Sequence, residues 1–585
     1  MHRPYHYHLI ATLAVVAGAV TGAGAALAQS ASQPQSTAQP VSQPAFQPLA
    51  SPTANDLKTA GSLIDDASPA GKLRELLAGD VSGLIARKDD RPAVEAFYRG
   101  RAFAPLWSAD GVPNARAKAV IAYLRGVDAD GLDPADYPVP GFRDTSPQAR
   151  AEDDLKLTNS VLAFVRHART GRVSYTRISQ SIHYEQQFPD PAEVLGKLAE
   201  TDDVRAALDS HLPQHRGYKA LKAKLAELRG GGATSARIEK GPVLRLVAKK
   251  KKGEQALMHD PRVPALRTRF GLPGGSDTAY DQTLADAVKK FQRSRELPAN
   301  GELNAATVDA LNGTRNAGGQ RMNAILATLE RWRWMPRDLG RAYVMVNVPD
   351  YTLKVVDQGK TAWATRIVVG KPGEMATPLL SETMKYITVN PTWNVPPSII
   401  RNEYLPALAR DPGALSRIGL KVQRKRDGTL HVYQPPGPRN ALGRIRFNFP
   451  NMFLVYQHDT PNKHLFARSE RAYSHGCMRV QDPETYAEVL LSLTQPTDKI
   501  TAERIRRLYG DSERTINLKT PIPVHLTYQT AFVDDAGQLQ LRRDLYGRDE
   551  EIMRVLRDER AVADLPVGRR YNAGSKPIMA RAAGR

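Results

Sequence analysis

The chain has very little cysteine, which limits the chemistry it can carry. Cys477 is the single cysteine in 585 residues, so no disulfide can form within the chain and no site with several thiolate ligands can hold a metal. Apolar residues make up 41% and charged residues 24% of the sequence. These globular proportions exclude a chain that is disordered or fibrous throughout. At roughly 100–200 residues per domain, the length predicts about three or four domains.

Acidic side chains are also scarce relative to basic ones. Lys and Arg number 82 against 61 Asp and Glu, which gives a formal net charge of +21. A positive field of this size favours an anionic partner, and nucleic acid, anionic lipid and an acidic wall polymer all meet that description. Composition alone does not choose among these partners.

An apolar run near the N-terminus predicts export. Arg3 precedes the run from Leu9 to Val20, and Ala26-Leu27-Ala28 has the small-x-small pattern of a cleavage site. We interpret residues 1–28 as a secretory signal peptide, with an uncleaved membrane anchor as the alternative. Residues 29–56, rich in Gln, Ser, Pro and Ala, predict a disordered linker. Export to the periplasm argues against nucleic acid as the partner.

Two helical regions follow the linker. Apolar residues three and four positions apart predict a helical scaffold domain over residues 57–255. Residues 256–318 contain an amphipathic helix with Val288 and Phe291 on its apolar face, then a glycine turn and a Thr-capped helix. This second segment resembles the three-helix peptidoglycan-binding domain. A generic helical bundle is the alternative.

Short β-branched runs then replace the helical pattern. Runs at 343–348, 352–356 and 364–369 are separated by turn residues and predict successive strands. A later run, 524–533, ends at a hairpin-like turn over 534–537. The fold class predicted for the chain is therefore multidomain α+β, with a helical scaffold, a small helical domain and a β-rich domain.

The β-rich domain is predicted at residues 341–547, after a connecting segment at 319–340. Within it, residues 401–444 are rich in Pro and Arg and too irregular for core strands, so we interpret this segment as a capping insertion over a cleft. Residues 548–585 predict a C-terminal helix and a basic tail.

The single cysteine lies in a segment with the features of a nucleophile. Cys477 follows Ser474, His475 and Gly476, while His458 is expected at the end of a strand from Met452 to Gln457. A thiol attacks an acyl carbon once it is deprotonated, and a neighbouring imidazole can take its proton. A helix predicted from Pro483, with Asp482 as its N-cap, begins shortly after the cysteine.

Other groups near the cysteine could assist such an attack. The backbone N–H groups around Gly476 and Cys477 are candidate donors to a tetrahedral oxyanion. In an extended segment, Arg479 faces the same side as Cys477 and could hold a substrate carboxylate. Two alternatives stay open: a buried, inert cysteine, and a metal site from His458, His475 and Cys477 that lacks a recognisable fourth ligand set.

The motif resembles the signature of the YkuD-type catalytic domain of L,D-transpeptidases, in which a His precedes Ser/Thr-His-Gly-Cys. Further matching segments are Val369 to Pro372 with Thr377-Pro378, Asn390 to Ile399, and Gln434 to Gly443. Together they resemble the large YcbB-like branch of Gram-negative bacteria. That branch joins a helical scaffold, a peptidoglycan-binding domain and a catalytic domain with a capping insertion.

The resemblance implies acyl transfer through a cysteinyl thioester, with no metal and no organic cofactor. It implies Cys477 as the nucleophile, His458 as the general base, and Gly476 with Cys477 as backbone donors to the oxyanion. His475 is the second candidate base, because many members of this branch carry Ser at that position. The implied reaction releases terminal D-alanine from a tetrapeptide stem and forms a 3→3 crosslink to an amine of another stem.

The resemblance also implies partners and competing activities. Peptidoglycan stem peptides and glycan are the expected partners, carbapenems are expected to acylate the cysteine, and the substrate-binding residues are predicted to be Arg479, Tyr473, Ser474, Trp393 and Asn394. Water as acceptor would make the same site an L,D-carboxypeptidase, and a protein amine would make it a wall-attachment enzyme. A noncatalytic peptidoglycan-binding scaffold is the alternative of another class. We expect a monomer, and peripheral association with the membrane or with other wall enzymes stays open.

Overall fold

The computed structural model describes residues 65–231, 238–247, 257–274, 276–294, 297–424, 426 and 428–557. The predicted signal peptide, the linker and the basic tail beyond residue 557 lie outside the described residues. Within the described ranges, no helix combines the length and the apolar character needed to cross a membrane.

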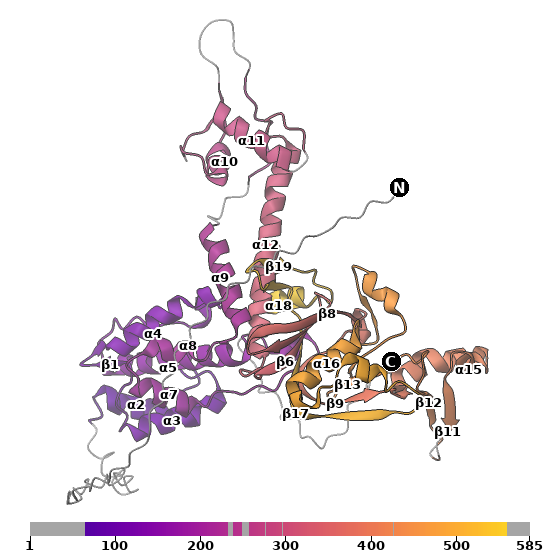
Figure 1. Ribbon diagram of the computed structural model, residues 1–585. Helices are drawn as coiled ribbons and strands as arrows, with labels where there is room; N and C mark the ends of the chain where they lie inside the picture. Colours follow the sequence, from indigo (N-terminus) through magenta and orange to yellow (C-terminus); the bar gives the residue numbers. More distant parts are fainter. Residues whose placement is uncertain are drawn as a thin grey trace, which may run out of the picture. The chain divides into compact units, whose positions relative to one another are not determined.

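A helical domain opens the described chain, as predicted (Figure 1). The longest of its helices, α5, is 24 residues long and buries residues along most of its length, among them Leu155 and Phe164 at 0% exposure. These side chains form one apolar core with neighbouring helices. The main helices are α2 (Pro69–Ala78), α3 (Arg91–Gly100), α4 (Ala115–Arg125), α5 (Pro147–Thr170), α7 (Pro191–Glu200) and α8 (Val204–Asp209). The next helix, α9 (Arg216–Gly231), packs instead into the core of the β-rich domain through Tyr218, Leu221 and Leu225.

A second, separate core belongs to the next small helical domain. It contains the predicted apolar face, with Val288 fully buried and Phe291 packed against the cluster. Its elements are β4 (Met258–His259), α10 (Val263–Phe270), β5 (Ala279–Tyr280), α11 (Gln282–Ser294) and the start of α12 (Ala305–Trp334). The last helix is capped by Asn304, whose side chain accepts a hydrogen bond from the Thr307 N–H at 2.9 Å, and not by a Thr as the sequence predicted.

The helix α12 continues without interruption for 30 residues and crosses the predicted boundary at residue 318. Its C-terminal half packs into the core of the β-rich domain through Ile325, Leu329, Trp332 and Trp334. One helix therefore belongs to two cores.

The β-rich domain is built on a ten-stranded sheet. The strand order is β13-β14-β16-β8-β7-β6-β17-β9-β3, with β15 beside β8. The first strand of this order, β13, also pairs with β9, so the strands from β13 to β9 form a closed ring. The strands are β3 (Ile182–His183), β6 (Ala342–Asn347), β7 (Thr352–Asp357), β8 (Lys360–Gly370), β9 (Leu379–Val389), β13 (Ile445–Asn448), β14 (Gln457–His458), β15 (Ala472–Ser474), β16 (Met478–Val480) and β17 (Arg514–Thr527).

The strand predictions held for β6, β7 and β8, and the predicted hairpin is present as β18 (Ala531–Val533) and β19 (Leu539–Leu541). The predicted strand from Met452 to Gln457 is wrong, because Met452 and Phe453 lie in a turn and Leu454 has a φ of 56°. The pairing of β3 with β9 places a piece of the scaffold region in the catalytic sheet.

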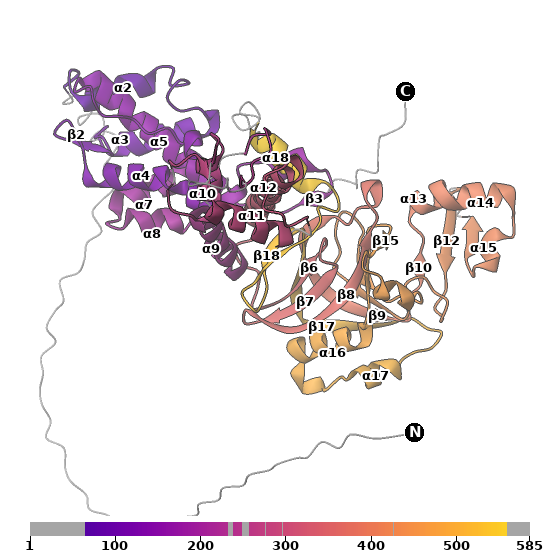
Figure 2. The same ribbon diagram turned by 90° about the horizontal axis from the view of Figure 1, so that it is seen from above.

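The helix α16 (Pro483–Thr494) covers one part of this sheet, as Figure 2 shows. Tyr486 on α16 is fully buried, and its ring packs on Phe447 and stacks on Trp363. Asp482 stands at the predicted N-cap position but makes no side-chain cap bond. Its carboxylate instead accepts from the Thr365 hydroxyl at 3.2 Å.

The capping insertion, residues 401–444, is more regular than predicted. Two of its segments, β11 (Lys421–Arg424) and β12 (Leu430–Gln434), pair with each other, and β12 also pairs with β10 (Trp393–Asn394). These three strands, the cap sheet, have a small apolar core of their own. It contains Val395, Ile399, Leu415, Leu420 and Val432.

Candidate active site

The pairing of β14 with β16 brings the predicted catalytic residues together. These strands run parallel, with Gln457 opposite Met478 and His458 opposite Arg479. Gln457 and Met478 are both fully buried on the core side. Because side chains alternate along a strand, His458 and Arg479 lie on the opposite face. Cys477 directly precedes β16, and the charge of Arg479 acts on its thiol.

Cys477 is partly exposed and surrounded by hydrogen-bond donors. Burial of the sulfur raises the pKa of the Cys477 thiol to about 11, although hydrogen bonds from the backbone and the hydroxyl of Tyr456 and the positive charges of Arg479 and Arg446 act in the opposite direction. The thiol is therefore protonated at neutral pH. It needs a base at the moment of attack.

His458 is the first candidate for that base. Its side chain is 5% exposed, and its Nδ1 donates to the carbonyl oxygen of Asp459 at 2.5 Å. The backbone of Leu442 is a second hydrogen-bond partner of the ring. Burial lowers the pKa of His458 to about 3, and the charge of Arg479 adds to this effect. The imidazole is therefore neutral and able to accept a proton.

Asp459 orients His458 through its backbone and not through its carboxylate. The carboxylate is taken up by the Arg444 N–H at 2.8 Å and by the Lys463 ammonium at 2.6 Å.

His475 has different surroundings. It is exposed, and its Nε2 lies 2.6 Å from Oε1 of Glu403. Glu403 belongs to the π-helical turn Ile400–Tyr404 in the capping insertion. His475 thus connects the cysteine loop to the capping insertion. His458, in contrast, is buried in β14.

The backbone of the cysteine loop depends on a glycine. Gly476 has a φ of 112°, a conformation that residues with a Cβ rarely adopt. Its N–H donates to the Ser474 hydroxyl at 3.2 Å, and that hydroxyl donates to the Cys477 carbonyl at 2.5 Å. Two predictions are corrected here. The Gly476 N–H is already bonded, which leaves the Cys477 N–H as the candidate oxyanion donor, and Ser474, 2% exposed, is bonded within the loop.

The other predicted substrate-binding residues lie in separate elements. Trp393 and Asn394 form β10, at the edge of the cap sheet, and Tyr473 is half-buried in β15. Trp393 hydrogen-bonds the hydroxyl of Tyr456, which in turn contacts the Cys477 thiol. Asn394 is exposed and its Oδ1 is 3.0 Å from Nε2 of His431 within the cap sheet, so its side chain is already engaged there.

Sequence reasoning missed two residues of this site, Tyr456 and Arg446. Tyr456 precedes His458 by two positions, and the two rings are in contact. A spacing of two places residues of a strand on one face, so the sequence could have indicated Tyr456. Arg446 lies opposite His458 in β13, with its guanidinium 5.5 Å from the centre of the Tyr456 ring. Among the described residues, the Nε atoms of Arg446 and Arg479 are buried without a hydrogen-bond partner. Two guanidinium groups with unused donors therefore flank the thiol.

The predicted alternative of a metal site finds no support in the geometry. In the part of the chain that the structure describes, no three His, Cys, Asp or Glu side chains are arranged to hold a metal ion. The residues brought together at Cys477 are those of a nucleophile with a base and cationic neighbours.

Family models match three segments of the chain in order. Residues 92–225 match a scaffold domain, residues 267–311 match a "Putative peptidoglycan binding domain", and residues 341–524 match the YkuD family, an L,D-transpeptidase catalytic domain. The last match contains Cys477, His458 and the capping insertion.

Individual proteins are similar to parts of the chain. A protein of Haemophilus influenzae named "Putative L,D-transpeptidase" is 28% identical over 225 residues, which are 36% of this chain and 45% of that protein. The match thus spans less than half of the relative. Crystal structures of L,D-transpeptidases from Xylanimonas cellulosilytica and Stackebrandtia nassauensis each cover 48% of this chain and 100% and 97% of their own. Both are 14% identical, with TM-scores of 0.14 and 0.15.

Proposed function

We propose that this chain, which carries a YkuD-type L,D-transpeptidase catalytic domain, forms 3→3 crosslinks between peptidoglycan stem peptides in the periplasm through a thioester on Cys477. The observation that carries the proposal is the parallel pairing of β14, which ends at His458, with β16, which begins directly after Cys477, together with the charges of Arg446 and Arg479 beside the thiol. The N-terminal export pattern supports the compartment.

The first half of the reaction is acylation of Cys477. His458 accepts the thiol proton on Nε2 as the sulfur attacks the carbonyl carbon of the third residue of a tetrapeptide stem. The Cys477 N–H stabilises the oxyanion. The intermediate then collapses, the bond to the terminal D-alanine breaks, and His458 returns the proton to the departing amine.

The second half resolves the thioester. The side-chain amine of another stem's diamino acid attacks the acyl carbon and gives a proton to His458, and the sulfur leaves and recovers that proton. An amide has replaced the thioester, and the enzyme is regenerated. No redox partner or cofactor enters this balance.

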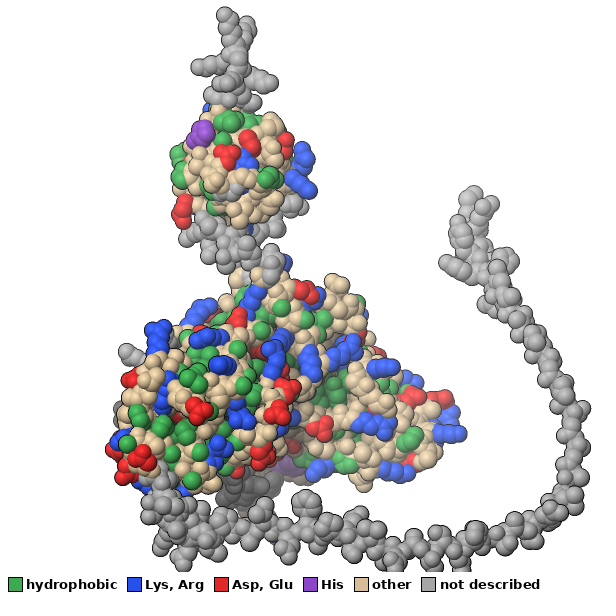
Figure 3. All heavy atoms as spheres, turned by 90° about the vertical axis from the view of Figure 1, so that its left-hand side faces the viewer, with side chains coloured by type: hydrophobic (Ala, Val, Ile, Leu, Met, Phe, Trp, Pro, Cys, Tyr) green, Lys and Arg blue, Asp and Glu red, His purple; other side chains and the backbone are tan. Residues whose placement is uncertain are grey.

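The charge around the thiol suits a stem peptide. The terminal D-alanine carries a carboxylate, and guanidinium groups bind carboxylates through charge-assisted hydrogen bonds. Arg479 and Arg446 supply positive charge beside the thiol, since both lower the pKa of Cys477. On the face shown in Figure 3, by contrast, basic side chains are dispersed among acidic and apolar ones. The positive charge around Cys477, and not the charge of that surface, is what favours an anionic substrate.

The capping insertion supports amine over water as acceptor. It reaches the cysteine loop through Glu403 and His475, and the cap sheet reaches the thiol through Trp393 and Tyr456. Contacts on both sides of Cys477 would shield a thioester from bulk water. Weaker shielding would turn the same residues toward L,D-carboxypeptidase activity.

The test is incubation of the purified protein with peptidoglycan fragments that carry tetrapeptide stems, followed by mass analysis. The wild type should produce dimers linked through two diamino acids and should release D-alanine, and Cys477→Ala should reduce both by about a thousandfold or more. Tripeptide products alone would show hydrolysis instead of crosslinking. Dimers formed equally by Cys477→Ala would overturn the thioester mechanism.

A further inference from the structure

The peptide group between Gly476 and Cys477 accepts a hydrogen bond from one buried side-chain hydroxyl. Thr377, 0% exposed, donates from Oγ1 to the Gly476 carbonyl at 2.9 Å. The same Oγ1 accepts a hydrogen bond from the Gly370 N–H at 2.9 Å. This hydroxyl therefore links the end of β8 to the peptide group before the nucleophile.

That peptide group decides where the oxyanion donor points. In a trans peptide the carbonyl and the following N–H lie in one plane and point in opposite directions. The bond from Thr377 to the Gly476 carbonyl therefore fixes the direction of the Cys477 N–H.

Thr377 is in turn held by Tyr546. The Tyr546 hydroxyl accepts from the Thr377 N–H at 3.2 Å and donates to the Gly370 carbonyl at 2.7 Å. The two chain segments approach so closely that a Cβ on Gly370 would lie 1.9 Å from the Met375 carbonyl oxygen. Loss of the Tyr546 hydroxyl would leave two backbone groups at this contact without their partner.

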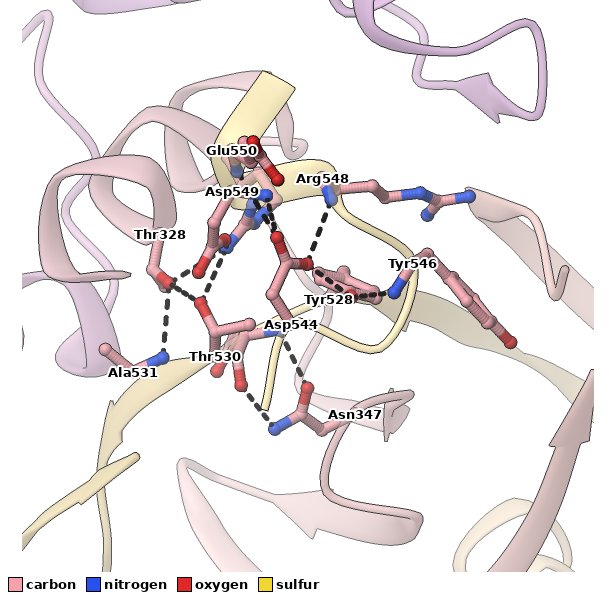
Figure 4. A network of polar contacts seen from close by, with 12 residues as sticks. Thr328, Asn347, Tyr528, Thr530, Ala531, Asp544, Tyr546, Arg548, Asp549 and Glu550 are labelled. Carbon is pink, nitrogen blue, oxygen red and sulfur yellow. Dashed lines mark hydrogen bonds and ion pairs between the residues drawn. The ribbon is translucent and has the colours of Figure 1, made fainter. Parts of the chain in front are cut away.

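Tyr546 itself belongs to a network that extends to the helices α18 (Arg548–Arg557) and α12 (Figure 4). Its N–H donates to the Tyr528 hydroxyl at 2.6 Å, and that hydroxyl donates to the Asp544 carboxylate at 2.7 Å. The carboxylate also accepts from the backbone N–H groups of Arg548 and Asp549 at the start of α18. Asp549 pairs with Arg331 of α12 at 2.5 Å.

We propose that Tyr546 is a positioning residue that, through Thr377 and the Gly476 carbonyl, aims the Cys477 N–H at the developing oxyanion. The proposal rests on the proposed function, since it assumes acyl transfer at Cys477. It assigns a role to a residue of the C-terminal segment, beyond the part of the chain that matches the catalytic family model. The hydrogen-bond network connects Tyr546 to α18 and α12, which limits the movement of its hydroxyl.

Two chemical probes separate this role from a general loss of structure. Acylation of Cys477 by a carbapenem passes through an oxyanion, whereas alkylation by iodoacetamide is a displacement at carbon that forms none. A positioning defect should slow the first reaction and spare the second. Both are followed by intact mass on the full-length protein, with thermal unfolding measured alongside.

The variants form matched pairs. Thr377→Val removes the hydroxyl with little change in shape, and Thr377→Ser keeps it. Tyr546→Phe is matched by Tyr184→Phe, a buried tyrosine whose hydroxyl also donates to a strand carbonyl, that of Leu526, at 2.7 Å. The double variant of Thr377→Val with Tyr546→Phe tests whether the two residues act through one contact.

We expect Thr377→Val to slow acylation by about tenfold to a hundredfold and Tyr546→Phe by about threefold to tenfold, with alkylation changed by less than about twofold. Thr377→Ser and Tyr184→Phe should acylate like the wild type, and the double variant should be no slower than Thr377→Val. Equal losses in acylation and alkylation, or an equal loss in Tyr184→Phe, would overturn the proposal. A wild type that no carbapenem acylates but iodoacetamide alkylates would instead refute the proposed function.

Discussion

Burial holds both reacting groups of the site neutral. The pKa of the Cys477 thiol is raised to about 11, and the pKa of His458 is lowered to about 3. Both shifts arise mainly because a charge is poorly solvated there. The resting enzyme thus contains a thiol and an imidazole, and not a thiolate with an imidazolium.

This state predicts how alkylation of Cys477 depends on pH. A raised pKa means that the thiolate fraction grows by about tenfold per pH unit from neutrality and levels off only above about 11. The rate of iodoacetamide alkylation of the free enzyme should therefore rise throughout the range from pH 7 to 10. A preformed ion pair would behave differently, with a rate already constant near neutrality. Intact mass at fixed times measures the rate, and Cys477→Ala is the blank.

The two histidines should differ in their effect on transfer. His458→Ala removes the buried base and should lower crosslinking by about a hundredfold or more. His475→Ser removes an exposed ring whose Nε2 contacts Glu403 and should cost less than about tenfold. Rates of dimer formation, with unfolding temperatures as the control, decide between them. A larger loss in His475→Ser would make His475 the base.

At the scale of elements, the cap sheet is independent of the main core. Its apolar cluster contains none of the residues of the large cluster around the main sheet. Its removal should therefore leave the rest folded. The Arg444 N–H must be retained, however, because it donates to the Asp459 carboxylate beside His458.

Replacement of residues 396–437 by a short Gly-Ser linker should give a folded protein that hydrolyses more and crosslinks less, because water gains access to the thioester. The ratio of tripeptide to dimer products measures this. Glu403→Gln is the milder companion variant, since it keeps the capping insertion and weakens the contact of residue 403 with His475. The cap interpretation fails if the deletion unfolds the domain or leaves the product ratio unchanged.

At the scale of the molecule, α12 couples the helical domains to the catalytic sheet. Trp334, near its end, is 1% exposed in the main core, and its indole N–H donates to the Val173 carbonyl of the scaffold region at 2.9 Å. Val308, in the first turn of the same helix, lies in the separate core of the small helical domain. The two ends of one helix therefore stabilise different domains.

Substitutions at these two ends should have separable effects. Trp334→Ala should lower the stability of the catalytic domain by about 3–5 kcal/mol, because a large buried side chain is replaced by a cavity. Val308→Ala should leave the unfolding transition of the catalytic domain unchanged. Thermal unfolding monitored by loss of carbapenem acylation reports on that domain alone. An equal shift in both variants would show that the two cores unfold as one unit.

The sequence alone determined those features that depend on local pattern. The strands β6 to β8 follow from β-branched runs, the start of α16 follows from Pro483, and the candidate nucleophile follows from the one cysteine beside His475 and Gly476. Each of these inferences needs only residues close together in the chain.

Tertiary structure decided what depends on residues far apart. Thr377, whose hydroxyl holds the Gly476 carbonyl, lies 99 positions from it in the chain, and Tyr546 lies 169 positions from Thr377, so no periodicity connects them. The engagement of the Gly476 N–H, the choice of the Asp459 carbonyl over its carboxylate, and the contact of Glu403 with His475 are outcomes of competition among several nearby donors and acceptors. Which group wins is set by strand register and by packing, because a buried polar atom takes the partner that the folded chain places within reach.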